Sequence, residues 1–246
     1  MSNCLVVQHV APESAFAIED ALRAAGVHVD TRCVFAGDDL PTDAAGLDGV
    51  VVMGGPTSAT SDEGFPTRRA ELFLLADALR TGVPTLGVCL GAQLVAVAAG
   101  SAVYPNAGGP EIGWGRVQLA PTCRDDPLFA DLPEFLTVMH WHGETLDVPA
   151  GGQLLIANAA CPHQAFRLGD TAWGMQFHLE VTPQAVEGFL TAFADDVAGV
   201  PGGADAVRAA TPACLAELAP VRDLVCGRFA SLVAAGVTRG ELVDLE

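Results

Sequence analysis

The chain has 246 residues, half of them hydrophobic, and a formal net charge of −18. This length suits one large α/β domain with a small appendage, and the apolar content is enough for a substantial core. All 12 basic residues are arginine, which excludes a lysine Schiff base and a P-loop lysine. The acidity also disfavours nucleic acids and anionic membranes as partners, because both carry the same sign of charge.

Neither a membrane segment nor a disulfide framework is indicated. No apolar run reaches the roughly 18 residues of a membrane span, and the first residues lack the basic and apolar regions of a signal peptide. We therefore expect a cytoplasmic protein. The 7 cysteines are scattered and include no C-x-x-C pair, so most are expected to be small buried residues rather than disulfide or zinc partners.

The first hundred residues alternate between strand and helix patterns. Strands are predicted over residues 5–10, 28–35, 47–53 and 83–86, and helices over residues 12–25, 67–79 and 94–99. This alternation predicts a flavodoxin-like, doubly wound and mostly parallel sheet with helices on both faces.

The pattern changes after Gly100. Short alternating segments over residues 117–120, 135–140, 154–157, 165–168 and 172–177 predict antiparallel hairpins added to the parallel core. A helix is expected over 183–193, with Thr182 as its N-cap. A glycine-rich linker at 199–203 and a helix over 204–235 follow, so we predict a domain over 1–198 and a linker with a C-terminal helical extension over 199–246.

The segment 87–93, Gly-Val-Cys-Leu-Gly-Ala-Gln, predicts a sharp turn between a strand and a helix, with Cys89 at its centre. Glycines on both sides would relieve the crowding of such a turn. The start of a helix favours thiolate over thiol. Cys89 is therefore a candidate nucleophile, although a buried cysteine at a strand end would give a similar pattern.

A base and an orienting group for that base are both present near residue 178. His178 and Glu180 would leave the same face of an extended chain. His178 could accept the thiol proton, and Glu180 could stabilise the imidazolium. The Gly-Gly-Pro segment at 54–56 follows a predicted strand, so the backbone N–H groups of Gly55 and Leu90 are candidate donors to an oxyanion.

Together these segments resemble the class I (triad) glutamine amidotransferases. Met-Gly-Gly-Pro at 53–56 is similar to the oxyanion loop of the family, residues 87–93 to its nucleophile elbow, and Gln-Phe-His-Leu-Glu at 176–180 to its His-x-Glu segment. Family members most often have proline where this chain has Leu179. Segments 111–114, 140–144 and 161–166 are similar to the glutaminase domain of GMP synthase, in particular to stand-alone relatives of it.

The resemblance implies that Cys89 attacks the side-chain amide of glutamine to form a γ-glutamyl thioester. It further implies that Gln93 contacts bound glutamine and that Trp141, His142 and Gly143 hold its α-carboxylate or amine. No cofactor or metal is needed for this chemistry. Because the sequence has no ATP-binding signature, released ammonia would pass to a synthetase on another protein.

Three alternatives remain open at this point. One is a γ-glutamyl hydrolase or peptidase that acts on γ-glutamyl amides or peptides with water as the acceptor. A second is a metal site in which the pairs His140/His142 and His178/Glu180 converge on one ion. A third is a non-catalytic regulatory relative, against which the complete set of cysteine, histidine and glutamate argues.

Overall fold

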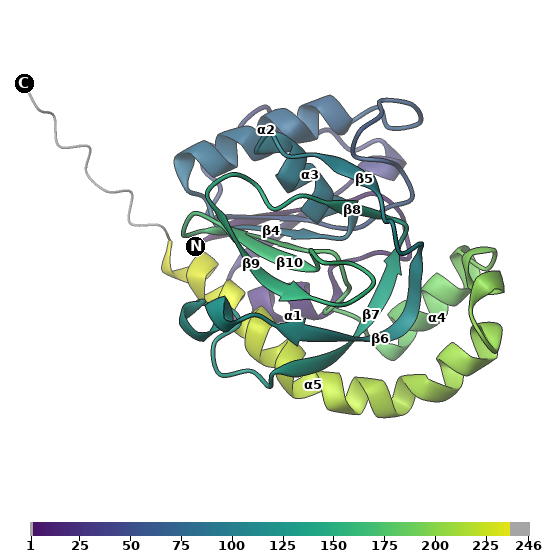
Figure 1. Ribbon diagram of the computed structural model, residues 1–246. Coiled ribbons are helices and arrows are strands. Elements are labelled where there is room, and N and C mark those ends of the chain that lie inside the picture. The colour runs from purple at the N-terminus through teal and green to yellow at the C-terminus, as the bar shows by residue number, and fades with distance from the viewer. Residues whose placement is uncertain (1, 237–246) are drawn as a thin grey trace, which may run out of the picture.

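A computed structural model describes residues 2–236, which form three layers (Figure 1). In this part of the chain the central sheet has nine strands in the order β2-β1-β3-β4-β11-β10-β9-β6-β7, and β5 pairs with β8 in a separate sheet. Helices α2 and α3 pack on one face of the central sheet, and α1, α4 and α5 pack on the other. The predicted doubly wound α/β architecture is thereby confirmed.

The strands are β1 (Asn3–Gln8), β2 (His28–Cys33), β3 (Gly49–Val52), β4 (Thr85–Val88), β5 (Val103–Pro105), β6 (Glu111–Leu119), β7 (Phe135–His142), β8 (Glu144–Leu146), β9 (Gly152–Ala157), β10 (Ala165–Leu168) and β11 (Ala172–Met175). The α-helices are α1 (Phe16–Ala24), α2 (Arg68–Thr81), α3 (Leu90–Ala98), α4 (Pro183–Ala192) and α5 (Gly203–Ala235). Short 3-10 helices are η1 (Val34–Ala36), η2 (Pro121–Asp125) and η3 (Asp196–Gly199).

The parallel part of the sheet contains β2, β1, β3, β4 and β11, and the remaining strands form the antiparallel extension. The predicted antiparallel hairpin is present here, because β10 and β11 pair antiparallel. The sequence did not predict that β11 also runs parallel to β4 and therefore belongs to the parallel core as well. All four of its residues are buried, as is usual for parallel strands that helices cover on both faces.

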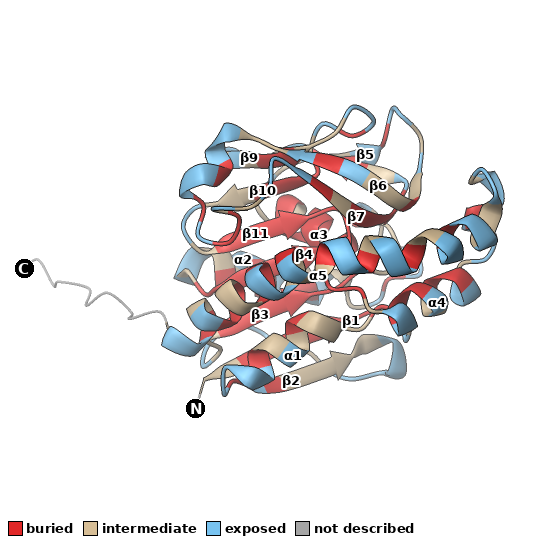
Figure 2. Ribbon diagram, turned by 90° about the horizontal axis from the view of Figure 1, so that it is seen from below, coloured by how far each residue is buried: buried red, intermediate tan, exposed pale blue. Residues whose placement is uncertain are grey.

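Side chains of the central strands alternate between the two helical layers. On β3, Val51 packs toward α1 and α5, whereas Val50 and Val52 pack toward α2 and α3. Figure 2 shows β1, β3, β4 and β11 as buried strands between these layers. None of the helices in residues 2–236 has the length and apolarity that crossing a bilayer requires. All cysteines of the chain lie in this range and are free thiols.

The first helix begins later than predicted, and the difference affects the site. The pattern indicated a start at residue 12, but α1 starts at Phe16. The preceding residues turn instead, because the N–H of Glu13 donates to the carbonyl of Val10 at 3.2 Å. The N–H of Ala17 donates to the carbonyl of Glu180 at 3.3 Å, which ties the start of α1 to the segment after β11. Glu13 therefore lies on a loop.

Helix α5 matches the predicted tail helix closely. It crosses the face of the sheet beside α1 (Figures 1 and 2), and a side chain on Gly49 of β3 would collide with Val233 at 2.7 Å. The indole N–H of Trp114 on β6 also donates to Thr211 of α5 at 3.0 Å. The domain division after residue 198 stays a prediction, and residues 237–246 of the proposed extension lie outside the described residues.

Phe229 provides a test of how strongly α5 is coupled to the domain. This α5 side chain is fully buried in the core, so Phe229→Ala should lower the free energy of unfolding by about 3–5 kcal/mol. Leu224→Ala, on the same helix but 40% exposed, should cost at most about 1 kcal/mol. Urea unfolding measures both. A separate low-stability transition, with the main midpoint unchanged by Phe229→Ala, would show that α5 is an independent unit.

Candidate active site

The turn between β4 and α3 has a backbone that few residues adopt. Cys89 has φ 52° and ψ −110°, and such strain outside glycine usually marks a functional position. A Cβ on Gly91 would lie 1.9 Å from the carbonyl oxygen of Val52, and one on Gly87 would lie 2.5 Å from the backbone of Gly91. Both glycines are therefore required by close backbone contacts, and the predicted elbow geometry is present.

Cys89 lies at the wall of a cavity of about 570 Å³ and is 6% exposed. Its thiol is directed at the carbonyl oxygen of Trp141, 3.6 Å from Sγ. The side-chain amide of Gln176 also approaches Sγ, at 3.8 Å. The sulfur is thus accessible from the cavity while its other sides are enclosed by the protein.

His178 and Glu180 lie behind Cys89, and both are fully buried. They follow the end of β11 rather than forming part of it, and the N–H of His178 donates to the carbonyl of Met139 on β7 at 2.8 Å. His178 Nδ1 is 2.8 Å from Glu180 Oε1, so the two side chains that the sequence paired are in hydrogen-bond contact. His178 Nε2 has no hydrogen-bond partner of ordinary geometry among residues 2–236, which leaves this nitrogen available to Cys89 or to a substrate.

Burial and charge influence the two groups in different ways. Burial raises the pKa of the Cys89 thiol, and the neighbouring His178 and the N–H of Leu90 lower it by less. The helix start therefore does not produce the low pKa that the sequence suggested, because desolvation is the larger effect. Burial lowers the pKa of His178, but the charge of Glu180 and contacts with Cys89 outweigh it, so this pKa lies well above its usual value.

A second carboxylate faces the opposite nitrogen of the same imidazole. Glu13 Oε2 is 3.9 Å from His178 Nε2, and Glu13 also borders the cavity. Burial raises the pKa of this carboxyl group. Its oxygen lies only 1.8 Å from where a Cβ on Gly54 would be, so the loop at 54–56 can approach only because residue 54 is glycine.

Both predicted oxyanion donors border the cavity. Gly55 lies on the loop after β3, and Leu90 is the first residue of α3. Within residues 2–236 the N–H of Gly55 donates to no other group. The N–H of Leu90 is directed at the Cys89 sulfur, where it lowers the thiol pKa. Because both residues border the same cavity as Cys89, their N–H groups suit two donors that meet at one oxygen.

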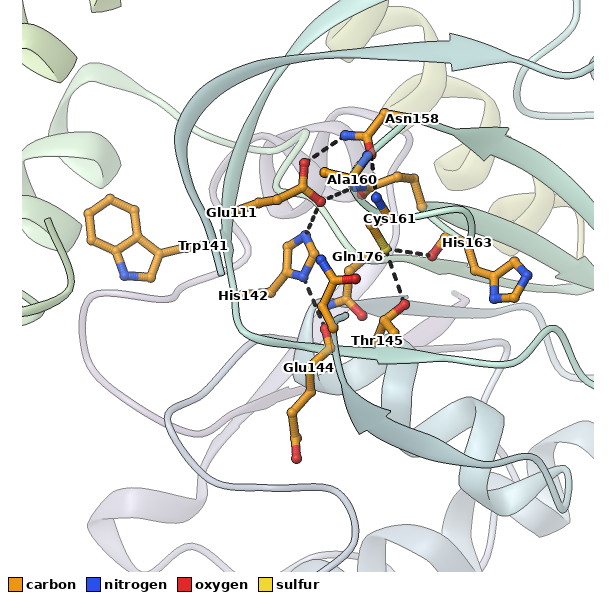
Figure 3. Close-up of polar contacts among 12 residues, drawn as sticks. Glu111, Trp141, His142, Glu144, Thr145, Asn158, Ala160, Cys161, His163 and Gln176 are labelled. Atoms are coloured by element: carbon orange, nitrogen blue, oxygen red, sulfur yellow. Dashed lines mark hydrogen bonds and ion pairs between the residues drawn. The ribbon is translucent and has the colours of Figure 1, made fainter. Parts of the chain in front are cut away.

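The four residues that the family resemblance assigned to glutamine binding also border this cavity. Gln93 donates to Gln176 at 3.2 Å. The Trp141 side chain packs edge-on against Phe189 of α4 and donates to Asp196 at 2.9 Å. It points away from His142 (Figure 3). Trp141 therefore joins the β7 strand to α4, and Gly143 continues the same cavity wall.

Glu111 joins the three segments that resemble the glutaminase domain of GMP synthase (Figure 3). The Nδ1 of His142 is 3.0 Å from the carbonyl oxygen of Glu144, and its Nε2 is 3.3 Å from Glu111 Oε2. Asn158 and Gln164 donate to the two Glu111 oxygens at 2.6 and 2.7 Å. This network fixes the loop after β7 at the cavity.

The possible metal ligands in the structure differ from those that the sequence suggested. Glu111, His140 and His142, rather than the pair at 178 and 180, place potential ligand atoms within 4.8 Å of one another. Both Glu111 oxygens already accept amide hydrogens. His140 has no hydrogen-bond partner within residues 2–236 to orient it, whereas metal-bound histidines almost always have one. We interpret the group as part of the polar network.

Four residues near Cys89 were not singled out by the sequence: His9, Glu13, Glu71 and Gln176. His9 Nδ1 is 3.0 Å from the Gly54 carbonyl oxygen, and His9 Nε2 is 2.8 Å from Glu71 Oε2. Gln176 had a usable signal, because it is two residues before His178 in an extended segment. The other three follow β1 or lie in the first turn of α2, where polar residues are common.

A family profile described as "Glutamine amidotransferase class-I" matches residues 14–194, a range that includes every predicted site residue. The chain belongs to the class I glutamine amidotransferase family. Among curated relatives, the glutamine amidotransferase-like protein YfeJ of Salmonella typhimurium is 34% identical over 80% of this chain and 83% of its own length. GMP synthase of Porphyromonas gingivalis is 33% identical over 62% of this chain, but the match spans only 29% of that enzyme.

Solved amidotransferase structures agree with this assignment. A glutamine amidotransferase of Thermotoga maritima has a TM-score of 0.83 at 26% identity and matches over 94% of this chain and 98% of its own. One from Methylobacillus flagellatus has a TM-score of 0.77 at 27% identity, over 96% and 93% of the two chains. The expected similarity to stand-alone amidotransferases is therefore confirmed.

The tight contact at Gly91 can be tested by adding one methyl group. Gly91→Ala would place a carbon 1.9 Å from the Val52 carbonyl oxygen, so we expect a loss of about 3 kcal/mol or more in unfolding free energy. Gly227→Ala, in α5 with open space around it, should be neutral or stabilise by up to about 1 kcal/mol. Denaturant titrations compare the two, and equal stabilities would contradict the proposed contact.

A pH profile can test the pairing of His178 with Glu180. Removing the carboxylate charge makes loss of a proton from the Cys89–His178 pair easier, whichever atom loses it. Glu180→Gln should therefore move the acidic limb of the kcat/KM profile to lower pH and also lower kcat, because the imidazole loses its orienting partner. Glu187→Gln, at an exposed side chain of α4, is the control. A limb that stays in place or moves to higher pH would contradict the pairing.

Proposed function

We propose that this protein hydrolyses the side-chain amide of glutamine through a Cys-His-Glu triad. Cys89 attacks the amide carbon, His178 takes the thiol proton and returns a proton to the departing ammonia, and Glu180 orients and stabilises the imidazolium. Water then releases glutamate from the γ-glutamyl thioester by the same steps in reverse order. No cofactor or metal takes part.

One observation carries this proposal. The strained Cys89 borders a cavity, while the hydrogen-bonded pair of His178 and Glu180 lies buried behind it. Two backbone donors, at Gly55 and Leu90, border the same cavity. In acyl transfer an oxyanion forms next to the nucleophile, and a single donor to it is typically worth about 3–4 kcal/mol. A buried structural cysteine would require neither the strain nor the donors.

The recipient of the ammonia is proposed to be a separate synthetase. The match to GMP synthase spans only 29% of that enzyme, which supports a chain that supplies ammonia to a synthetase on another protein. A partner subunit would deliver the acceptor and could increase glutamine turnover by ordering the cavity wall.

A second candidate is hydrolysis of γ-glutamyl amides or peptides, and the cavity favours it. Its volume of about 570 Å³ lies in the range of pockets that hold drug-sized ligands, which leaves room for a substituent on the γ-nitrogen. The chemistry at Cys89 would be unchanged, with an amine instead of ammonia as the leaving group.

Substitutions at the triad test the shared chemistry. Cys89→Ala should lower kcat by about 10⁴-fold or more without altering stability, and His178→Asn should be nearly as severe. Glu180→Gln should be milder, because its role is orientation and charge. Cys214→Ala, a partly exposed cysteine of α5, is the control. Ammonia release by the Cys89→Ala protein at the wild-type rate would overturn the assignment.

No variant is needed to choose between the two substrates. Turnover of glutamine and of short γ-glutamyl peptides should be compared alone and with candidate synthetases. Slow glutamine turnover that a synthetase accelerates would support the amidotransferase subunit. Rapid peptide hydrolysis by the isolated protein would support the hydrolase. A wild-type protein that is inert with both substrates, and that glutamine-like electrophiles do not label at Cys89, would be a non-catalytic relative.

A further inference from the structure

His9 packs against the backbone of the loop at 54–56. This residue directly follows β1 and is 9% exposed. Its Nδ1 lies 3.0 Å from the carbonyl oxygen of Gly54. A Cβ on Gly55 would meet the Cβ of His9 at 2.7 Å, so the loop backbone rests on this side chain. No part of the proposed triad mechanism uses His9.

His9 is itself held by a buried carboxylate. Glu71, in the first turn of α2 and 0% exposed, places Oε2 2.8 Å from His9 Nε2. The hydroxyl of Thr67 donates to the other oxygen of Glu71 at 2.7 Å. The ring of Phe65 packs edge-on against the imidazole at a centroid distance of 5.5 Å. The imidazole therefore has one well-defined orientation.

We propose that His9 is a positioning residue that aims the N–H of Gly55 at the oxyanion. The peptide between Gly54 and Gly55 is trans, so its carbonyl and its N–H point in opposite directions. When His9 Nδ1 binds the carbonyl on one side, the N–H is directed to the other side, toward the cavity that Gly55 borders. The inference rests on the proposed function, because it assigns a purpose to the oxyanion donor of that reaction.

The hydrogen bonds also determine the protonation of His9. The Gly54 carbonyl can only accept, so Nδ1 must carry a hydrogen. An ionised Glu71 likewise accepts, and it requires a second hydrogen on Nε2. A doubly protonated ring would polarise the Gly54–Gly55 peptide and make its N–H a stronger donor. Burial lowers the pKa of His9, but the hydrogen bond and charge of Glu71 outweigh burial and raise it.

The first test compares two replacements of His9. Asparagine can place an amide donor near the position of Nδ1, whereas leucine cannot donate. We expect His9→Leu to lower kcat by about 100-fold, the loss typical of one oxyanion donor, with KM changed by less than about threefold. His9→Asn should recover much of this loss. The control is His28→Asn, an exposed histidine on β2, which should leave kcat unchanged.

Glu71→Gln tests the same contact without altering the imidazole. The charged groups that face His9 are Glu71 and Glu13, and only Glu71 changes in this variant. Because the doubly protonated ring polarises the Gly54–Gly55 peptide most strongly, activity should fall as pH rises through the His9 pKa. Removing the Glu71 charge lowers that pKa, so the alkaline limb of kcat should move to lower pH. Glu63→Gln, an exposed residue of the loop before α2, should not move it.

Nitrogen-15 NMR provides a readout that does not depend on turnover. Both ring nitrogens of His9 should be protonated at pH 7, and the Gly55 amide resonance should shift in the His9→Leu protein and less in the His9→Asn protein. A neutral His9 ring, an unmoved Gly55 resonance, or equal losses of kcat in the two variants would overturn the proposal. If the wild-type protein turned over neither glutamine nor a γ-glutamyl peptide, the proposed function would be refuted. The NMR results would still decide whether His9 orients the Gly54–Gly55 peptide group.

Discussion

The first turn of α3 lies directly on the carboxyl end of β3, and the rest of the site depends on this contact. The carbonyl of Val52 leaves no space for a side chain at Gly91, and Gly87 must be equally bare. Cys89, between them, is held at positive φ. The residues of α3 from Leu90 to Ala96 are all buried, and their packing offsets the cost of the strained backbone. The sulfur is thereby exposed to the cavity at a fixed place.

The same site concentrates carboxylates around a single imidazole. Glu180 binds Nδ1 of His178, and Glu13 faces its Nε2. In a buried site each carboxylate stabilises an imidazolium more strongly than it would in water. Besides burial, the charge of Glu13 opposes ionisation of the Cys89 thiol. Despite burial, the charge of Glu180 raises the pKa of His178 well above its usual value.

Local sequence patterns were sufficient for most of the framework. The apolar run at β3, the helical spacing in α2 and the tail helix α5 could all be recognised. A fully buried strand leaves a continuous apolar run, and a helix with one buried face leaves apolar residues at helical spacing. The parallel pairing of β11 with β4 could not be recognised, since the composition of β11 suits either strand direction. The start of α1 was also misplaced, because hydrogen bonds to Val10 and from Ala17 to Glu180, rather than propensity, determine it.

By itself, the sequence determined the α/β class, the glycine-flanked cysteine turn and the His-x-Glu pair, because each depends on residues that are close in the chain. Tertiary structure alone decided that His9, Glu13 and Glu71 meet at this site. They come from the loop between β1 and α1 and from helix α2, and no spacing rule links these two segments. Tertiary structure also decided that the pKa of the Cys89 thiol is raised, because desolvation depends on how completely the other layers of the fold cover the sulfur.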